Sequence, residues 1–266
     1  MTAEKLIEIA IEAGKITLGA KRDKKITTKE GRANFVTEYD TRVQTFLIEK
    51  IKETVPDALF VCEESDKNDG YDDHSYRFVI DPIDGTTNFI RNAPEYAICI
   101  GVMQGDKQVC AVVHCPVLNI TYFADSGKGA FVIKNGVTEE IHVTSSGLDG
   151  AIIAAGTSPY LTELLDTTLG LTRHLLDRAA DTRRSGSAAI DICRAAEGVC
   201  DIMFEFSNYA WDYTAASIIL TEAGGKFCDL NGNKIRGDIQ SSVLGGSPLA
   251  VNEFLDHYKL FLSKNG

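Results

Sequence analysis

Apolar residues recur at helical spacing in two stretches near the beginning of the chain, residues 3–20 and 38–53. An apolar residue at every third or fourth position gives a helix one face that packs against a core. We therefore predict two amphipathic helices. Their apolar positions are Leu6, Ile9, Ala10, Ala13 and Ile16 in the first stretch and Val43, Phe46, Leu47 and Ile51 in the second.

The pattern then changes to short apolar runs bounded by polar or turn-forming residues, which is typical of β-strands. The first two runs are residues 58–62 and 77–80. Four more follow in quick succession, at residues 95–104, 108–115, 119–124 and 129–133. Because the turns between these four runs are short, they predict an antiparallel meander that carries the two helices on one face.

After about residue 145, strand-like runs alternate with helical patterns, as in an α/β unit. We predict strands at residues 151–155, 181–184 and 200–205 and helices at residues 160–176, 187–197 and 211–222. The fold class is therefore mixed α/β (α+β). The chain is expected to form an N-terminal α+β domain at residues 1–145 and a smaller α/β domain at residues 146–266, with the boundary near Thr144–Gly147.

The composition is that of an ordinary globular protein: 266 residues with 44% hydrophobic content can bury a real core. The 38 acidic residues outnumber the 27 basic ones, and a net charge of −11 argues against extended contacts with nucleic-acid phosphates. Seven scattered cysteines without a C-x-x-C pair indicate neither disulfides nor structural zinc. Without a signal-peptide pattern or an apolar stretch of membrane-spanning length, we expect a cytoplasmic protein with no membrane contact.

The segment Asp81–Phe89, with the sequence D-P-I-D-G-T-T-N-F, places two carboxylates three residues apart after an apolar run. Pro82 removes a backbone donor, so we expect Asp81 and Asp84 to lie in a bent loop at the end of a strand. Gly85 permits close backbone approach, and the N–H groups from Gly85 onward suit a helix start that receives a phosphate. The same string also fits ordinary turn chemistry.

Two other acidic segments belong to the candidate chemistry. Glu63 and Glu64 follow a strand-like run, and Asp212 opens a helical pattern. Taken alone, the glutamates fit surface acids before a polar loop, and Asp212 fits a first-turn acid favoured by the helix dipole. Together with Asp81 and Asp84 they supply enough hard oxygen ligands for more than one divalent cation, which suits phosphate-ester hydrolysis.

Taken in their order along the chain, these acidic segments and their neighbours resemble the inositol monophosphatase family, a Mg²⁺-dependent, lithium-sensitive group related to the fructose-bisphosphatases. The similar strings are Val36–Asp40, Glu63–Ser65, Asp81–Phe89, Trp211–Asp212 and Glu222–Gly225. The resemblance covers essentially the whole chain. It implies a layered αβαβα sandwich, a homodimer and two or three Mg²⁺ ions per subunit, with direct attack of water on a phosphate monoester and no protein nucleophile.

The resemblance also implies roles for individual residues. One metal ion would be held by Glu63, Asp81 and the carbonyl of Ile83, and a second by Asp81, Asp84 and Asp212. Thr86, paired with Asp40, would help to activate the attacking water, with Glu63 as the third catalytic residue. The residues implied to bind substrate are Asp84, Gly85, Thr86, Gly186, Ser187, Ala188, Glu205 and Asp212.

Without the resemblance, two of these residues have ordinary interpretations. Asp40 fits a capping box with Thr37, and Glu205 fits a solvated strand end.

Three functions stay open. The first is a phosphatase for myo-inositol 1-phosphate or a similar polyol monophosphate. The second is a phosphatase for fructose 1,6-bisphosphate, histidinol phosphate or an adenosine bisphosphate, whose second phosphate would meet one of four arginines that otherwise fit a solvated basic surface: Arg173, Arg178, Arg183 and Arg184. The third is a partner of the transcription machinery, as some bacterial proteins that resemble this chain are; its acidic charge suits a basic protein partner better than bare RNA.

Overall fold

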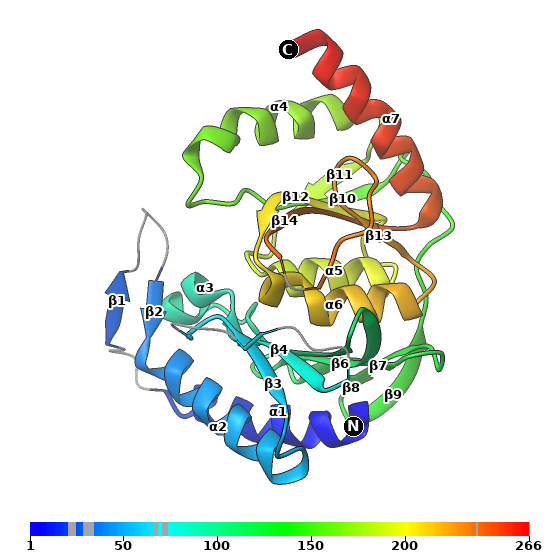
Figure 1. The fold of residues 1–266 in the computed structure, drawn as a ribbon. Helices are drawn as coiled ribbons and strands as arrows, with labels where there is room; N and C mark the ends of the chain where they lie inside the picture. Colours follow the sequence, from blue (N-terminus) through cyan, green and yellow to red (C-terminus); the bar gives the residue numbers. More distant parts are fainter. Residues whose placement is uncertain (21–24, 29–34, 66–68, 71–73, 238, 266) are drawn as a thin grey trace.

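The computed structural model describes residues 1–20, 25–28, 35–65, 69–70, 74–237 and 239–265. The main elements lie in five layers, which Figure 1 shows from bottom to top as helices, a seven-stranded sheet, helices, a five-stranded sheet and helices. This order confirms the expected αβαβα sandwich. A pair of short antiparallel strands, β1 (Ile26–Thr28) and β2 (Phe35–Thr37), leads into the second helix.

The seven-stranded sheet contains the predicted meander. Its strands are β3 (Leu59–Cys62), β4 (Tyr76–Asp84), β5 (Ala97–Gln104), β6 (Lys107–Cys115), β7 (Ile120–Asp125), β8 (Ala130–Lys134) and β9 (Val137–Ile141), in that spatial order. Neighbouring strands are antiparallel except for β3 and β4. β9 lies outside the predicted strands, because its first four residues are exposed and it has no apolar run.

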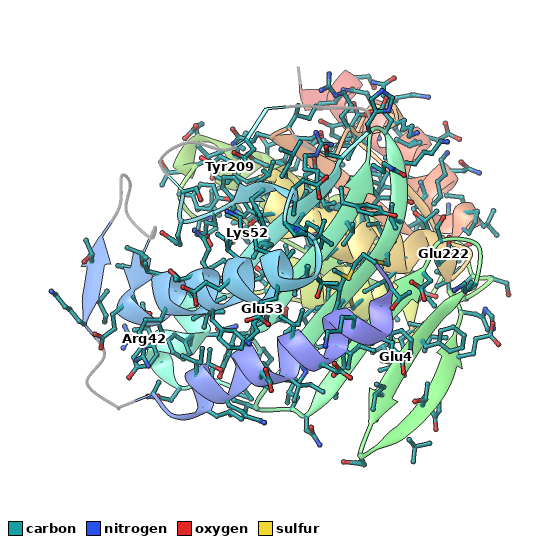
Figure 2. All side chains as sticks on the ribbon, turned by 60° about the horizontal axis from the view of Figure 1, so that its bottom comes forward. Glu4, Arg42, Lys52, Glu53, Tyr209 and Glu222 are labelled. Atoms are coloured by element: carbon teal, nitrogen blue, oxygen red, sulfur yellow. The ribbon has the colours of Figure 1, made fainter. Side chains whose placement is uncertain are left out.

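Helices α1 (Ala3–Leu18) and α2 (Glu38–Thr54) confirm the two predicted amphipathic helices. They lie side by side across one face of the seven-stranded sheet, as Figure 2 shows. Their apolar faces and that face of the sheet form one core, to which Leu6, Leu47 and Phe78 each contribute a fully buried side chain. The exposed side chains of Arg42 and Lys52 lie on the outer side of α2.

The five-stranded sheet has the order β11-β10-β12-β14-β13. Its strands are β10 (Ile152–Ala155), β11 (Asp181–Arg183), β12 (Ile202–Asn208), β13 (Lys226–Cys228) and β14 (Ser241–Gly246). The first three are parallel to one another, and β14 is antiparallel to both of its neighbours. Helices α4 (Leu165–Leu175) and α7 (Pro248–Asn265) cover the outer face of this sheet. β13, β14 and α7 lie outside the predicted strands and helices.

Between the sheets lie α5 (Ala188–Ala196) and α6 (Ala210–Glu222). Because α6 contacts strands of both sheets, nearly its whole length is buried and apolar residues surround it. The chain passes from the first sheet to the second between β9 and β10, and the domain boundary near residues 144–147 stays a prediction. Within the described residues, no helix combines the length and the apolar character needed to cross a membrane.

Candidate active site

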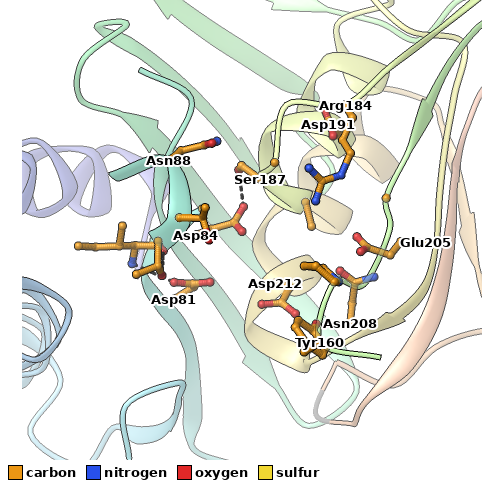
Figure 3. Close-up of a pocket in the computed structure, with 18 of the residues that line it drawn as sticks. Asp81, Asp84, Asn88, Tyr160, Arg184, Ser187, Asp191, Glu205, Asn208 and Asp212 are labelled. Carbon is orange, nitrogen blue, oxygen red and sulfur yellow. Dashed lines mark hydrogen bonds between the residues drawn. The ribbon is translucent and has the colours of Figure 1, made fainter. Parts of the chain in front are cut away.

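A cavity of about 320 Å³ lies between the two sheets, where the beginnings of α5 and α6 meet the end of β4 (Figure 3). Every residue that was expected to hold a metal ion or to bind substrate lines this cavity. These residues are Glu63, Asp81, Ile83, Asp84, Gly85, Thr86, Gly186, Ser187, Ala188, Glu205 and Asp212. The remaining candidate, Asp40, is fully buried and lies behind Thr86. The fold therefore brings together segments that are far apart in the sequence.

A β-bulge in β4 brings Asp81 and Asp84 to the same side of the sheet. In a regular strand, side chains three residues apart point to opposite faces. Here Asp81 pairs with Cys99 and Asp84 with Ala97, so that two residues of β4 oppose the single residue Ile98. The extra residue reverses the alternation. The prediction of a bent loop is therefore wrong. Asp81 and Asp84 both lie within β4, and the bulge places them on the same side of the sheet.

Three carboxylates form a tight group in the cavity. Oxygen atoms of Asp81, Asp84 and Asp212 all lie within 4.8 Å of one another. Burial is the main cause that raises the pKa of Asp81 and Asp212 well above the usual value, and repulsion from neighbouring carboxylates, that of Glu63 included, adds to the shift. Glu63 lines the same cavity outside this group of three. A hard divalent cation favours such oxygen donors and offsets their repulsion, so the donor set fits Mg²⁺.

Asp84 also connects the seven-stranded sheet to α5. Its Oδ2 atom accepts hydrogen bonds from the hydroxyl of Ser187 at 2.5 Å and from the backbone N–H of Ala189 at 2.8 Å. Ser187 caps α5 by accepting a hydrogen bond from the N–H of Ile190. The N–H of Ala188 has no acceptor within the described part of the chain and lies at the cavity wall. The start of α5 therefore offers this donor, and the positive end of the helix dipole, to an anion.

Thr86 and Asp40 form a pair beside the carboxylate group. Gly85, with a φ of 95°, makes the left-handed turn after which α3 (Thr86–Arg91) begins. The Thr86 hydroxyl lies 3.4 Å from Oδ1 of Asp40 and 3.1 Å from the carbonyl oxygen of Ile83. The other carboxylate oxygen of Asp40 accepts hydrogen bonds from the N–H and hydroxyl of Thr37, which confirms the capping box. Burial raises the pKa of Asp40 to about 6.

A second bulge, in β12, brings Glu205 and Asn208 to the cavity, because the two residues between them oppose only Ser242 of β14. Glu205 is buried, and its Oε1 atom accepts hydrogen bonds from the N–H and hydroxyl of Ser158 at 2.7 and 3.1 Å. Only glycine fits beside it, since a Cβ on Gly156 would lie 2.2 Å from the carboxyl carbon of Glu205. Neither Ser158 nor Gly156 was among the predicted site residues, because no local sequence pattern links them to Glu205.

Other residues of the cavity wall were also missed. Asn88 donates hydrogen bonds through Nδ2 to the carbonyls of Glu95 and Ser185, which holds the loop before α5 against α3. Tyr160 enters the wall from the segment before α4. The residues from Gly85 onward predict a helix start, but no local pattern marks Ser185 as the distant partner of Asn88.

Of the four arginines considered for a second phosphate, only Arg184 lines the cavity. The other three, Arg173, Arg178 and Arg183, form exposed ion pairs with aspartates. Arg184 forms no ion pair with a described residue, and Figure 3 shows its side chain pointing into the cavity on the side of Glu205. The cavity therefore combines a carboxylate group on one side with a cationic side chain on the other.

Comparison with known proteins shows which sequences and folds this chain is similar to. The model of the inositol monophosphatase family matches residues 2–258. The Nus factor SuhB of Pasteurella multocida is 33% identical over 244 residues, which make up 91% of this chain and 89% of that protein. The solved structure of the Thermotoga maritima IMPase has a TM-score of 0.86 and 26% identity, with 99% of this chain and 98% of that chain covered. The suhB structure from Bartonella henselae has a TM-score of 0.85 and 26% identity, with 96% of both chains covered.

Proposed function

This chain belongs to the inositol monophosphatase family, and on that premise we propose that it is a Mg²⁺-dependent phosphomonoesterase that converts myo-inositol 1-phosphate, or a similar polyol monophosphate, to the polyol and phosphate. The observation that carries the proposal is that one cavity is lined by a group of three carboxylates, by the beginning of α5 and by Glu205. The three carboxylates suit cations, the beginning of α5 suits an anion, and Glu205 suits hydroxyl groups.

In the proposed site, Asp81, Asp84 and Asp212 hold Mg²⁺, and Glu63 and the carbonyl of Ile83 complete the ligands of two or three ions. Bound there, Mg²⁺ neutralises the ester phosphate and lowers the pKa of water. One oxygen of Asp84 is bonded to α5, which leaves its other oxygen for the cation. The buried carboxylates supply the negative charge that makes the site selective for a divalent ion.

Thr86 and Asp40 orient the attacking water. When the Thr86 hydroxyl donates its hydrogen bond to Asp40 or to the carbonyl of Ile83, the lone pairs of the Thr86 oxygen are left to accept a hydrogen bond from the attacking water. With the hydroxyl directed at Asp40, the proton that the water loses passes to Thr86 while the Thr86 proton passes to the Asp40 carboxylate. Thr37 holds the Asp40 carboxylate in place through two hydrogen bonds, so Asp40 keeps its orientation when substrate enters.

The phosphate group is proposed to lie against the beginning of α5, where the N–H of Ala188 donates to it, with Gly85 and Gly186 allowing close backbone approach. The hydroxyl groups of the polyol donate to Oε2 of Glu205, because Ser158 already donates to Oε1. The two ends of the substrate are thus distinguished by a donor at one end and an acceptor at the other.

A phosphate-release assay tests the proposal over myo-inositol 1-phosphate, fructose 1,6-bisphosphate, histidinol phosphate and 3′-phosphoadenosine 5′-phosphate, with and without lithium. We expect the highest kcat/KM for the inositol ester, no turnover in EDTA and inhibition by lithium. Glu205→Gln should raise KM for the inositol ester more than it lowers kcat. Turnover that persists in EDTA, or no turnover of any of the four esters, contradicts the proposal.

Arg184 favours a second candidate, a phosphatase whose substrate carries a second anionic group. Such a group would lie beside the guanidinium and gain a charge-assisted hydrogen bond. If this candidate is right, Arg184→Gln lowers kcat/KM for fructose 1,6-bisphosphate by about tenfold, the equivalent of one good charged contact. The same variant would leave kcat/KM for the inositol ester nearly unchanged.

The relatives named Nus factor SuhB favour a third candidate, a partner of the transcription machinery. The net charge of −11 suits a basic protein surface. Asp84→Asn separates this role from hydrolysis, because the variant should lose phosphate release and keep any protein binding. Pull-down with purified transcription-elongation components measures the second property.

We also propose a homodimer, as the family resemblance implies, and light scattering of the purified protein measures its mass.

A further inference from the structure

A second cavity, of about 630 Å³, lies against α6 and shares no lining residue with the catalytic cavity. Its walls come from the turn between β5 and β6, from one side of α6, from β13 and from residues 234–237. Its volume falls within the range of roughly 300–1,000 Å³ that small-molecule sites occupy. The volume alone does not identify a ligand, but the residues that line the walls indicate its chemical class.

The walls carry an excess of positive charge in an acidic protein. Lys107, Lys234 and Arg236 line the cavity, and Asp106 is the one carboxylate among its described lining residues. The ammonium groups of Lys107 and Lys234 form no ion pair within the part of the chain that the structure describes. In a chain with a net charge of −11, such a group of cations favours an anionic ligand.

The part of the wall that α6 forms presents hydroxyl groups. Thr214, Ser217 and Thr221 lie on one side of α6 and line the cavity, although the rest of this helix is buried in apolar surroundings. Their hydrogens are already donated to backbone carbonyls: Thr214 to that of Gly237, Ser217 to that of Thr214 and Thr221 to that of Ser217. Each hydroxyl oxygen can still accept a hydrogen bond from a ligand.

We propose that this cavity is a second binding site, for a small phosphorylated sugar or polyol whose occupancy is coupled to the catalytic site through α6. The phosphate binds the cationic wall, and the ligand hydroxyls donate to the hydroxyl oxygens of α6. The coupling begins at Tyr213, whose hydroxyl donates to the carbonyls of Arg236 and Ile239 at 2.7 Å each. Tyr213 directly follows Asp212 in the chain, so a ligand that orders residues 234–237 also restrains the helix turn that carries Asp212.

The test is calorimetric binding of ribose 5-phosphate, with ribose as the neutral comparison, to the full protein in EDTA. Without divalent cations, the charges of the three grouped carboxylates in the catalytic cavity are uncompensated and repel the phosphate. We expect binding by the wild type and by Asp84→Asn, and weaker binding of ribose. The double variant Lys107→Glu with Lys234→Glu should bind ribose 5-phosphate at least about tenfold more weakly, since each reversed charge repels the phosphate.

A matched control carries Lys5→Glu and Lys50→Glu on α1 and α2, where both lysines are in exposed ion pairs. The control has the same change in net charge and should bind like the wild type. Equal weakening in the control, loss of binding in Asp84→Asn, or no binding by the wild type overturns the site. Hydrogen–deuterium exchange measures the coupling: ligand should slow exchange in residues 210–222, and binding without this protection overturns the link to α6.

Discussion

Asp84 and Ser187 lie 103 positions apart in the chain, yet the hydroxyl of Ser187 donates a hydrogen bond to Oδ2 of Asp84. Asp84 ends β4, and Ser187 caps α5. This bond ties a proposed metal ligand to the wall that we propose receives the phosphate. Under the proposed function, Asp84 therefore helps to position both the cation and the substrate phosphate.

Replacing Thr86 by valine should lower kcat by about 100-fold, the lower end of what a positioned proton-transfer group contributes. KM should change little, because valine keeps the shape of threonine and loses only the hydroxyl that lies near Asp40 and Ile83. Thr86→Ser should retain most of the activity. Steady-state kinetics on the inositol ester measure both variants, with Thr45→Val on the exposed side of α2 as the control. Equal losses in the valine and serine variants would count against the role of the hydroxyl.

Gly156→Ala should displace Glu205, since the new Cβ would lie 2.2 Å from its carboxyl carbon. We expect KM for a polyol ester to rise by about tenfold, the value of one lost charged hydrogen bond. Overpacking should also lower the free energy of unfolding by about 1–3 kcal/mol. The matched control is Gly70→Ala, because no atom lies within 4 Å of a Cβ built at that position. An unchanged KM would show that Glu205 does not contact the substrate.

His114 should make the protein less stable in mild acid. Burial lowers the pKa of this histidine from 6.5 to about 4. As pH falls through 6.5, the unfolded chain takes up a proton that the folded protein does not. The contribution of neutral His114 to the free energy of unfolding is therefore complete at neutral pH and decreases until pH reaches about 4. The loss from this one group is on the order of 3 kcal/mol. His114→Asn, which keeps a polar atom near Thr121, should remove this part of the pH dependence.

Urea unfolding of both proteins between pH 4 and pH 7 measures this difference. The buried carboxylates titrate in both proteins and cancel in the comparison. The stability advantage of the wild type over the variant should therefore shrink as pH falls. A constant difference across this range would contradict the prediction.

Mg²⁺ should stabilise the folded protein through the carboxylate group. A ligand present at 100 times its dissociation constant adds about 2.7 kcal/mol to the free energy of unfolding. Asp212→Asn removes one oxygen donor of the group and should abolish most of this gain. Thermal unfolding with Mg²⁺ or EDTA measures it, and Asp166→Asn, on the exposed side of α4, is the control. If the melting temperature of the wild type is the same in Mg²⁺ and in EDTA, this result would argue against a metal site.

The sequence predicted those parts of the fold in which local pattern decides the structure. The apolar spacing in α1 and α2 was sufficient, because these helices bury one face only. The segment of α7 carries the same signal, with Pro248 at the first position followed by Val251, Phe254 and Tyr258, although no helix was predicted there. β9 lacked an apolar run, since its first four residues are exposed and Ile141 alone is buried.

For the candidate site, the sequence indicated the types of residue but not their arrangement. Asp81 and Asp84 lie three residues apart in one short segment, so a common role as metal ligands could be predicted. The partners of Asp84 and Glu205 lie 103 and 47 positions away, at Ser187 and Ser158. Such pairs depend on how strands and helices pack, which no local pattern records.

Because of the bulges in β4 and β12, the number of residues in each strand decides which side chains reach the cavity. Deleting one residue between Asp81 and Asp84 would restore regular pleating and turn one of the two acids toward the layer of α1 and α2. The same deletion between Glu205 and Asn208 would turn one of them toward α4 and α7. Each shortened chain would keep every acid named here and still lack an oxygen donor where the reaction is proposed to occur.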